Sequence, residues 1–302
     1  MKGNTIKYKE DPLGSETHNG VEIAVFTPGQ NLDKTTVSSF GDEWKTFSSF
    51  DQEEIERIGD KYFQILLPHL TANTTLLDAG CGTGRWSRYL SPHVGEIEAI
   101  DPSDAVHSAT QLLKDCSNAR VTRAGIDNIP FTNDSFDVVC SVGVLHHMPN
   151  TLDGIKSCVA KIKSGGWMYV YLYYALDNRG FIFRLIFQLS NLVRGLISKL
   201  PNTLKQIACD FLAVTLYLPF VTLARVTRKL LPKSKLYEKI PLCGYIDESF
   251  WVMRNDSRDR FGTPLEQRFT RQQIEQMFVD AGLTNINFSE NLPFWCAIGQ
   301  KP

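Results

Sequence analysis

Residues 76–86 read Leu-Leu-Asp-Ala-Gly-Cys-Gly-Thr-Gly-Arg-Trp. An apolar run of strand character ends in an acid, three glycines follow at alternate positions, and residues 85–90 have the character of a helix start. A strand, a tight turn and a helix together bring backbone N–H groups and a helix N-terminus against a ligand. Glycine allows the positive φ or the close approach that such a turn requires. We therefore predict a ligand at this turn.

The spacing of the glycines narrows the class of ligand. A dinucleotide fingerprint G-x-G-x-x-G that starts at Gly80 needs glycine at position 85, where the chain has Arg85. A phosphate-binding loop of the Gly-Lys-Ser/Thr type is missing. Asp78 lies two residues before the first glycine, where an acid repels a pyrophosphate but suits a ligand with an ammonium group. The alternative without a ligand is a plain strand-to-helix turn with incidental glycines.

A second acid ends the next predicted strand, residues 97–101. Asp101 stands at its tip and is followed by Pro102-Ser103-Asp104, which opens another helix. A carboxylate at the tip of the second strand can accept both hydroxyls of a ribose, as in other α/β nucleotide sites. The alternative is a solvated strand end, and the preceding glycine turn favours the ribose interpretation.

The pattern D-x-G-x-G-x-G resembles the first motif of the class I S-adenosylmethionine (SAM) methyltransferases. In that family the acid and the loop hold the methionine end of the cofactor, directly or through water, and the acid of the following strand holds the ribose. The resemblance therefore implies SAM as the cofactor. It implies the following binding residues: Asp78, Gly80, Cys81, Gly82, Gly84, Asp101 and Pro102.

Residues 125–131 and 134–141 are similar to the family's "D-a-x-x-L-P-F … F-D-x-V" segment, which carries the adenine loop and the fourth strand. The chain departs from the pattern at Gly125, where family members often have an aspartate. By resemblance, adenine recognition falls to the Ile126 backbone, with Asp127 as a substitute for the aspartate. Val142 lies at the tip of the fourth strand, which borders both cofactor and acceptor in this family.

Two histidines follow that strand tip. His146 and His147 are similar to the family's common L-H-H segment, and a histidine there could remove a proton from the acceptor as the methyl group arrives. In the alternative, one histidine caps the next helix and the other packs. The sequence does not separate the two residues.

The alternation of strands and helices over residues 75–174 predicts an α/β fold with a doubly wound parallel sheet. Thr270 with Gln273 predicts a capping box at the start of the last helix, followed by strands at 283–288 and 294–298. The resemblance implies the seven-stranded, mostly parallel class I sheet with a helical insertion after strand five. We expect a flexible lead over 1–36 with one short strand, a SAM-binding core over 37–175 and 266–302, and a helical insertion over 176–265. Trp44 and Phe47 are candidates to cover the cofactor's sulfonium by cation–π contact.

The insertion is locally basic, although the whole chain has a net charge of -1. From Arg179 to Lys235 there are ten Lys or Arg and one acid, Asp210. The uncharged run 211–224 has fourteen residues, which is short of a membrane span. Two interpretations stay open: a lid or cap over the acceptor site, or an amphipathic patch over residues 179–235 that makes peripheral contact with an anionic membrane or a lipid-linked acceptor.

Residues 245–266 mix aromatic and charged side chains, as expected of a loop wall that contacts a polar acceptor. Related methyltransferases have a segment near the acceptor just before the last helix, so Asp259 and Arg260 are the acceptor-side candidates in this chain. The alternative is an ordinary loop joined by surface ion pairs.

The composition adds three expectations. The near-neutral charge shows no global basic excess that would point to nucleic acid. The seven scattered cysteines form no C-x-x-C pair, which argues against a zinc site and disulfides and for the cytoplasm. The polar N-terminus lacks a secretory signal.

These observations predict a SAM-dependent methyltransferase that acts on O or N of a small-molecule acceptor, such as a sugar derivative or secondary metabolite. A lipid or quinone at a membrane surface is the second choice of acceptor. Two rivals stay open: a non-catalytic SAM-binding protein, and a nicotinamide oxidoreductase, against which Asp78 and Arg85 count. We expect no metal, and the sequence sets no oligomeric state.

Overall fold

The computed structural model describes residues 6–38, 52–178 and 180–302. The chain divides into two compact units. The sheet unit comprises residues 1–175 and 265–302, and the helical unit comprises residues 176–264. The segment with Trp44 and Phe47 lies outside the described residues, so its expected contact with the cofactor stays a prediction.

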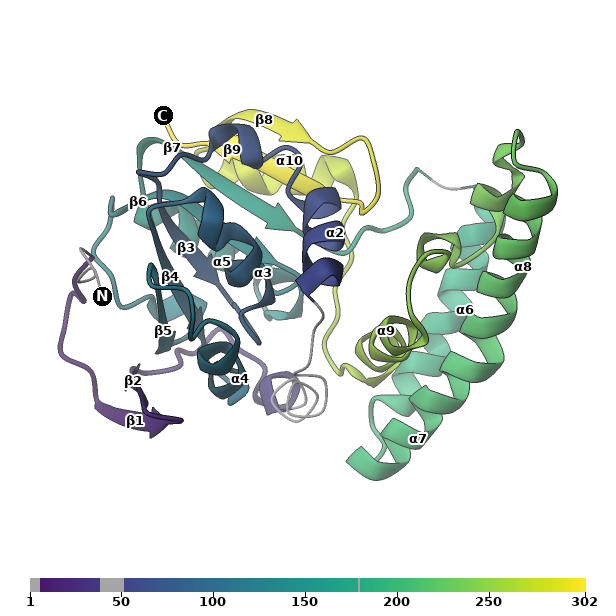
Figure 1. Cartoon of the computed structure of the whole chain (residues 1–302), viewed down its shortest axis with the longest axis horizontal. Coiled ribbons are helices and arrows are strands. Elements are labelled where there is room, and N and C mark those ends of the chain that lie inside the picture. Colours follow the sequence, from purple (N-terminus) through teal and green to yellow (C-terminus); the bar gives the residue numbers. More distant parts are fainter. Residues whose placement is uncertain (1–5, 39–51, 179) are drawn as a thin grey trace. The chain divides into compact units, whose positions relative to one another are not determined.

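The sheet unit is built on a sheet of nine strands in the order β1-β2-β5-β4-β3-β6-β7-β9-β8 (Figure 1). Neighbours from β2 to β7 run parallel, and β9 and β8 close the sheet antiparallel. The strands are β1 (Gly14–His18), β2 (Val21–Val25), β3 (Thr75–Ala79), β4 (Glu96–Asp101), β5 (Ala119–Arg123), β6 (Phe136–Val142), β7 (Ile162–Tyr171), β8 (Thr284–Phe288) and β9 (Cys296–Gln300). The predicted α/β fold with its mostly parallel sheet is confirmed.

Helices cover both faces of this sheet. One apolar core lies under α2 (Gln52–Tyr62), α3 (Arg85–Leu90) and α4 (Ala105–Leu112), and includes Phe63, Trp86 and Val106. The other lies under α5 (Thr151–Lys161) and α10 (Arg271–Asp280), and includes Ile155 and Phe278. Because both faces are covered, strands β3 and β6 are apolar almost throughout, which is typical of parallel sheets. The predicted capping box of Thr270 and Gln273 is present.

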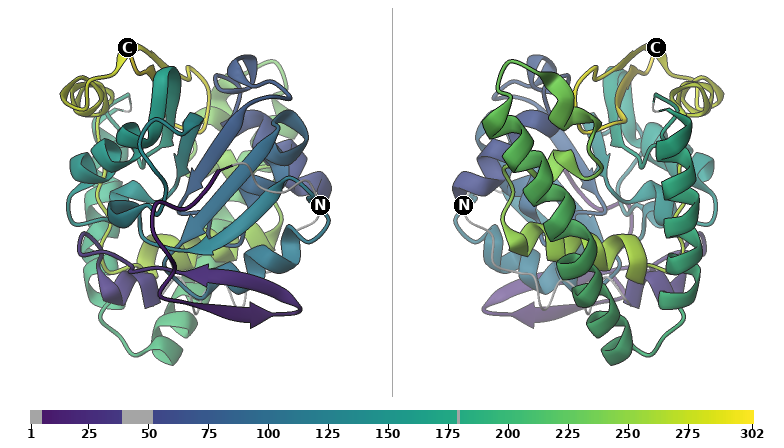
Figure 2. Two further views of the ribbon diagram at one scale, coloured as in Figure 1. Left: turned by 90° about the vertical axis from the view of Figure 1, so that its left-hand side faces the viewer. Right: turned by 90° about the vertical axis from the view of Figure 1, so that its right-hand side faces the viewer.

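The N-terminal segment differs from the flexible lead that the sequence predicts. Strands β1 and β2 form a hairpin, and β2 pairs parallel with β5, so two strands extend the family's seven. The hairpin is the purple pair of arrows in both ribbon figures (Figure 2). Asn19 and Gly20 take φ of 50° and 78° at its turn, the conformation for which Asn-Gly is the favoured pair.

Strand β7 is irregular near its start. It begins at Ile162 and includes Ser164, Gly165 and Gly166. The pairing with β6 jumps from Phe136–Ile162 to Val138–Trp167, and Gly165 takes φ of 80°. The extra residues form a bulge, which keeps the strand in the sheet despite the two glycines.

The helical unit contains α6 (Phe181–Ile197), α7 (Asn202–Leu212), α8 (Leu218–Leu230) and α9 (Phe250–Gly262). A π-helical turn, η5 (Ala213–Tyr217), joins α7 to α8 into one helix of 29 residues. By length and composition alone that helix is apolar enough to cross a membrane. The uncharged run counted in the sequence is too short to show this, because it leaves out the rest of the helix.

The predicted loop wall over 245–266 is largely the helix α9. Ser249 caps its N-terminus by accepting a hydrogen bond from the Val252 N–H, a signal that the sequence analysis missed. Met253 and Phe261 are buried in a core with Cys209, Tyr217 and Val221 of the α7–α8 helix. Arg254 and Arg258 both bind the Asp210 carboxylate, with their closest N–O distances at 2.6 and 3.0 Å.

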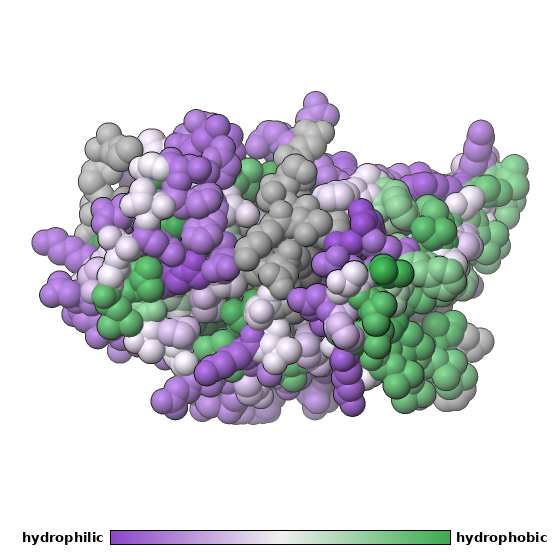
Figure 3. Space-filling view, turned by 90° about the horizontal axis from the view of Figure 1, so that it is seen from below, coloured by the Kyte–Doolittle hydropathy of each residue, from purple (hydrophilic) through white to green (hydrophobic). Residues whose placement is uncertain are grey.

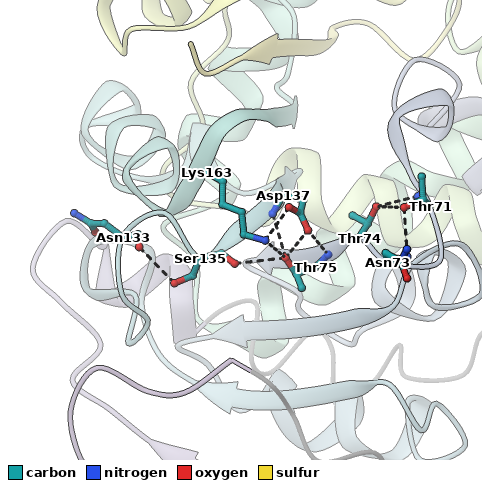
Figure 4. A network of polar contacts seen from close by, with 8 residues as sticks. All are labelled: Thr71, Asn73, Thr74, Thr75, Asn133, Ser135, Asp137 and Lys163. Atoms are coloured by element: carbon teal, nitrogen blue, oxygen red, sulfur yellow. Dashed lines mark hydrogen bonds and ion pairs between the residues drawn. The ribbon is translucent and has the colours of Figure 1, made fainter.

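A polar network fixes the ends of β3, β6 and β7 opposite the glycine turn (Figure 4). The Asp137 carboxylate accepts hydrogen bonds from the Thr75 N–H and Oγ1, each at 2.8 Å, and from Lys163 Nζ at 2.8 Å. Burial by itself raises the pKa of Asp137, but the bonds from Lys163 and Thr75 outweigh it and lower the pKa. The charged carboxylate therefore stabilises the folded chain.

We expect Asp137→Asn to lower the free energy of unfolding by about 1 kcal/mol, because the group is partly solvated and the loss is close to that of one ordinary hydrogen bond. Urea denaturation at neutral pH measures this change. Asp115→Asn, at an exposed position, is the control and should stay within about 0.5 kcal/mol of the unsubstituted chain. Equal stability of the two variants would contradict the role of the network.

Candidate functional site

The glycine turn after β3 takes the conformation that its sequence predicts. Gly80, Gly82 and Gly84 have φ of 85°, 53° and 79°. A Cβ on Gly80 would lie 2.6 Å from Cγ1 of Val144, so the backbone approaches its neighbour too closely for any side chain. The N–H groups of Gly80 and Cys81 both donate to the Ile100 carbonyl, at 2.8 and 2.9 Å. These bonds tie the turn to the end of β4.

Asp101, the last residue of β4, reaches the same turn. Its Oδ2 accepts a hydrogen bond from the Gly82 N–H at 3.0 Å. Its Oδ1 accepts from the N–H and Oγ of Ser103, at 2.8 and 2.6 Å. The structure thus brings together the two acid-led motifs, and Pro102 lies between Asp101 and Ser103 in the chain.

Asp78 is buried beneath the turn. Its carboxylate accepts from Ser87 Oγ at 2.6 Å and from Cys140 Sγ at 3.8 Å. Burial raises the pKa of Asp78 to about 6; the hydrogen bond from Ser87 opposes the rise and the charge of Asp101 adds to it. Sequence reasoning missed Ser87, whose position in the first turn of α3 was the available signal.

The negative charges of Asp78 and Asp101 limit which ligands fit this site. Within the described parts of the chain no salt bridge joins Asp78 or Asp101 to a cationic side chain. Two nearby acids without a counter-charge favour a cation and disfavour a phosphate. SAM carries a sulfonium and an ammonium group, so the residues present fit SAM better than a pyrophosphate cofactor.

The predicted adenine side lies on a short 3₁₀ helix, η3 (Ile126–Asn128). Ile126 is buried, and Asp127 Oδ2 accepts hydrogen bonds from the N–H groups of Gln30 and Asn31, at 2.5 and 2.7 Å. A Cβ on Gly125 would lie 1.7 Å from the Pro28 carbonyl oxygen, which explains why no aspartate can stand there in this chain. The role of Asp127 toward adenine stays a prediction, as does that of Val142, which is buried at the end of β6.

The two histidines occupy another short 3₁₀ helix, η4 (Leu145–His147), and the structure distinguishes them. His146 is fully buried, with its ring centroid 3.9 Å from that of Tyr173, and neither ring nitrogen has a hydrogen-bond partner within the described residues. Burial holds the pKa of His146 well below its usual range. His147 Nδ1 lies 2.7 Å from the Leu265 carbonyl oxygen. Because a carbonyl only accepts, Nδ1 carries a proton in this contact.

The segment that returns from the helical unit supplies neighbours that sequence reasoning missed. The Gln267 N–H donates to the His146 carbonyl at 2.9 Å. Arg268 Nε binds Glu266 Oε1 at 2.7 Å, and its guanidinium lies 5.0 Å from the centre of the Tyr173 ring. The Glu266 side chain is 1% exposed, which is unusual for an acid and marks a polar cluster inside the sheet unit.

The acceptor-side candidates belong to the other unit. Asp259 and Arg260 lie on α9, where Thr263 Oγ1 donates to Asp259 at 3.3 Å and Arg260 pairs with Asp256 at 3.5 Å. These contacts give both residues partners on or next to their own helix, and their role toward an acceptor stays a prediction. Over residues 6–38, 52–178 and 180–302, no three His, Cys, Asp or Glu side chains are grouped in a way that could hold a metal ion.

A family model and several curated proteins match part of this chain. Residues 77–170 match the family model described as "Methyltransferase domain". The tRNA U34 carboxymethyltransferase of Vibrio cholerae is 34% identical over 109 residues, which is 33% of this chain and 33% of that protein. The enzyme of the same name from Campylobacter curvus is 30% identical over 146 residues, 46% of each chain. The chain thus matches less than half of the length of these relatives.

Solved structures give weaker likenesses. The YcgJ protein of Bacillus subtilis is 15% identical and superposes with a TM-score of 0.47, covering 76% of this chain and 70% of that one. A SAM-dependent methyltransferase of Thermotoga maritima is 13% identical with a TM-score of 0.45, covering 86% and 100%. The topology of the sheet is established by its own strand pairing.

The comparisons confirm part of the sequence prediction and overturn another part. The match of residues 77–170 to a methyltransferase domain agrees with the predicted methyltransferase class and its SAM cofactor. The predicted small-molecule acceptor and the expected absence of a nucleic-acid partner are wrong, because the curated relatives are named for tRNA. The physical reason for the error is that a near-neutral net charge averages over the whole chain and describes no single surface. A cytoplasmic location agrees with those names.

The buried state of His146 predicts how stability depends on pH. Its pKa is lower in the folded chain than in the unfolded chain, where it is about 6.5. Below about pH 6.5 the unfolded chain therefore binds a proton that the folded chain does not, so stability falls with falling pH by up to about 1.4 kcal/mol per pH unit. His146→Phe removes this contribution, and its unfolding free energy should fall less steeply between about pH 6.5 and about pH 5.

Chemical denaturation over this range measures both slopes. His93→Gln, at an exposed histidine, is the matched control and should keep the slope of the unsubstituted chain. If His146→Phe also keeps that slope, then His146 is protonated in the folded chain and the assigned burial is wrong.

Proposed function

We propose that this chain transfers a methyl group from SAM to an acceptor in tRNA, because residues 77–170 match the family model described as "Methyltransferase domain". The observation that carries the donor half of the proposal is the pair of uncompensated carboxylates, Asp78 and Asp101, at a glycine turn tied to the tip of β4. The names of the curated relatives support the acceptor half.

Each part of the site has a task in this proposal. Asp78, through the turn it underlies, and the loop Gly80–Gly84 would hold the methionine end of SAM. Asp101 would accept the ribose hydroxyls, and the backbone at Ile126 would meet the adenine edge. The sulfonium of bound SAM makes its methyl group electrophilic without further activation. The chain's own work is then to orient the acceptor, exclude water and accept one proton.

His147 is the better candidate for the proton acceptor. Its Nδ1 lies 2.7 Å from the Leu265 carbonyl oxygen, so Nε2 would be the basic nitrogen of the neutral ring. The bond to Leu265 also fixes the orientation of the ring, as a general base requires. His146 is neutral and packed against Tyr173, which suits a structural support for the η4 turn.

The proposed acceptor is tRNA as a class. Position U34 and the carboxymethyl group belong to the names of the relatives and are not part of the proposal. The match to those relatives covers 33% of this chain for the Vibrio cholerae enzyme and 46% for the Campylobacter curvus enzyme. The predicted lid role of the helical unit is untested. We propose that the chain works in the cytoplasm, with the helical unit at a membrane surface for the reasons given in the next section.

Asp101→Ala should weaken SAM binding by at least tenfold, which corresponds to about 1.4 kcal/mol, because the ribose hydroxyls and the Gly82 N–H lose their acceptor. Titration calorimetry with SAM measures this change. Asp104→Asn is the control three residues away, where the carboxylate binds Arg123 instead. An unchanged dissociation constant for Asp101→Ala would remove Asp101 from the ribose role.

The acceptor is tested with SAM labelled on its methyl group and purified total tRNA. We expect label in the tRNA, and digestion with mass analysis of the nucleosides would identify the modified one and show whether a methyl group was added. His147→Gln should bind SAM normally but transfer label at least about a hundredfold more slowly, as for loss of a general base. Normal SAM binding without label in tRNA would overturn the acceptor and leave the donor site in place.

A further inference from the structure

The helical unit exposes a continuous set of apolar side chains. On α6 the stripe is Leu185, Leu189, Leu192 and Leu196, which recur every three or four residues and are 45%, 56%, 68% and 74% exposed. This spacing places them on one face of the helix. The α7–α8 helix carries two further groups at this spacing, one on each side of the middle of the π-helical turn: Leu204, Ile207, Phe211 and Val214, and then Leu223, Val226 and Leu230, all exposed.

The opposite face of the α7–α8 helix packs in the apolar core of the helical unit. Cys209, Tyr217 and Val221 are fully buried against Met253 and Phe261. A surface helix of a soluble protein is polar on its outer face, whereas this helix is apolar on the buried and the exposed face alike. Of the 21 exposed large hydrophobic side chains recorded for the described residues, 17 belong to the helical unit. Figure 3 shows them as the large green area over this unit.

A group of cations adjoins the apolar face. Lys229, Lys233, Lys235 and Lys239 follow one another from the end of α8 and are all exposed. No salt bridge joins them to a described residue, whereas the neighbouring Arg228 pairs with Asp247 at 2.7 Å. Lysine side chains beside leucines are suited to place their ammonium groups among lipid phosphates while their stems follow the apolar surface.

From this juxtaposition we propose that the α6–α8 face, defined by the two apolar stripes and the four lysines, docks on an anionic membrane surface. The lysines alone would also fit an RNA backbone. The stripes decide between the two, because aliphatic side chains gain nothing from a phosphate backbone, and RNA-binding surfaces use aromatic and polar groups beside their cations. Eleven aliphatic or aromatic positions at helical spacing match acyl chains instead.

The helix lies in the plane of the membrane in this proposal and does not cross it. A helix of 29 residues is about 43 Å long, longer than the hydrocarbon core of about 30 Å. Asp210 lies in the middle of α7 and binds Arg254 and Arg258, so one side of the helix is fixed to a charged partner helix. Crossing would carry those charges into lipid, whereas lying flat leaves them on the protein side.

The test uses the full chain and vesicles of phosphatidylcholine, with or without phosphatidylglycerol. We expect co-sedimentation with the anionic vesicles at least about tenfold tighter than with the neutral ones, and weaker binding as salt is added. Lys229→Gln with Lys233→Gln and Lys235→Gln should lose about tenfold or more of that affinity. Leu192→Gln with Leu196→Gln and Ile207→Gln should lose binding to both kinds of vesicle.

Lys114→Gln with Lys156→Gln is the matched control, since both lysines are exposed on the sheet unit. All variants should bind SAM with unchanged affinity, which shows that they fold and separates this proposal from the methyl-transfer proposal. Absence of vesicle binding by the unsubstituted chain would overturn it. The proposal would also be overturned if the lysine variant lost affinity for tRNA but still bound vesicles, because the surface would then be assigned to RNA. A dimer of the unsubstituted chain that the leucine variant abolishes would overturn it as well.

Discussion

The attachment of the glycine turn to the end of β4 is the constraint on which the rest of the sheet unit depends. The turn donates two N–H groups to the Ile100 carbonyl and a third to the Asp101 carboxylate. These bonds exist only where β3 and β4 are parallel neighbours, with Asp78 opposite Ala99. The sheet order therefore builds the site, and the three positive φ values at the glycines allow the chain to make these contacts.

The sequence predicts the parts of the fold whose signals are local. The βα alternation gave the parallel strands, and the Thr270 capping box gave the last helix. Prediction from the sequence fails where the position of an element depends on residues far away in the chain. The β1–β2 hairpin has a local signal in Asn19-Gly20, which the sequence analysis missed, but its attachment to β5 depends on residues far along the chain. The α9 helix carries few apolar residues, and its position depends on Asp210 and Tyr217 of a neighbouring helix.

The same division holds for the site. Asp78, the glycines and Asp101 follow from spacing, because neighbouring strands of a parallel sheet end at one edge. The collision between position 125 and the Pro28 carbonyl, and the bond from His147 to the Leu265 carbonyl, join residues about a hundred positions apart. No pattern in the sequence reports such contacts. The expected absence of a nucleic-acid partner rested on the net charge of the whole chain, which describes no single surface.

The uncompensated acids also explain why this site costs the protein stability. A lysine or arginine beside Asp78 and Asp101 would neutralise them and lower the pKa of Asp78, which burial now raises to about 6. Such a side chain would occupy the space and the charge that a cationic cofactor needs. The protein thus keeps a pair of carboxylates whose desolvation is offset in part by hydrogen bonds, and a cationic ligand would supply the missing positive charge. Selectivity for a sulfonium over a pyrophosphate follows from the same imbalance.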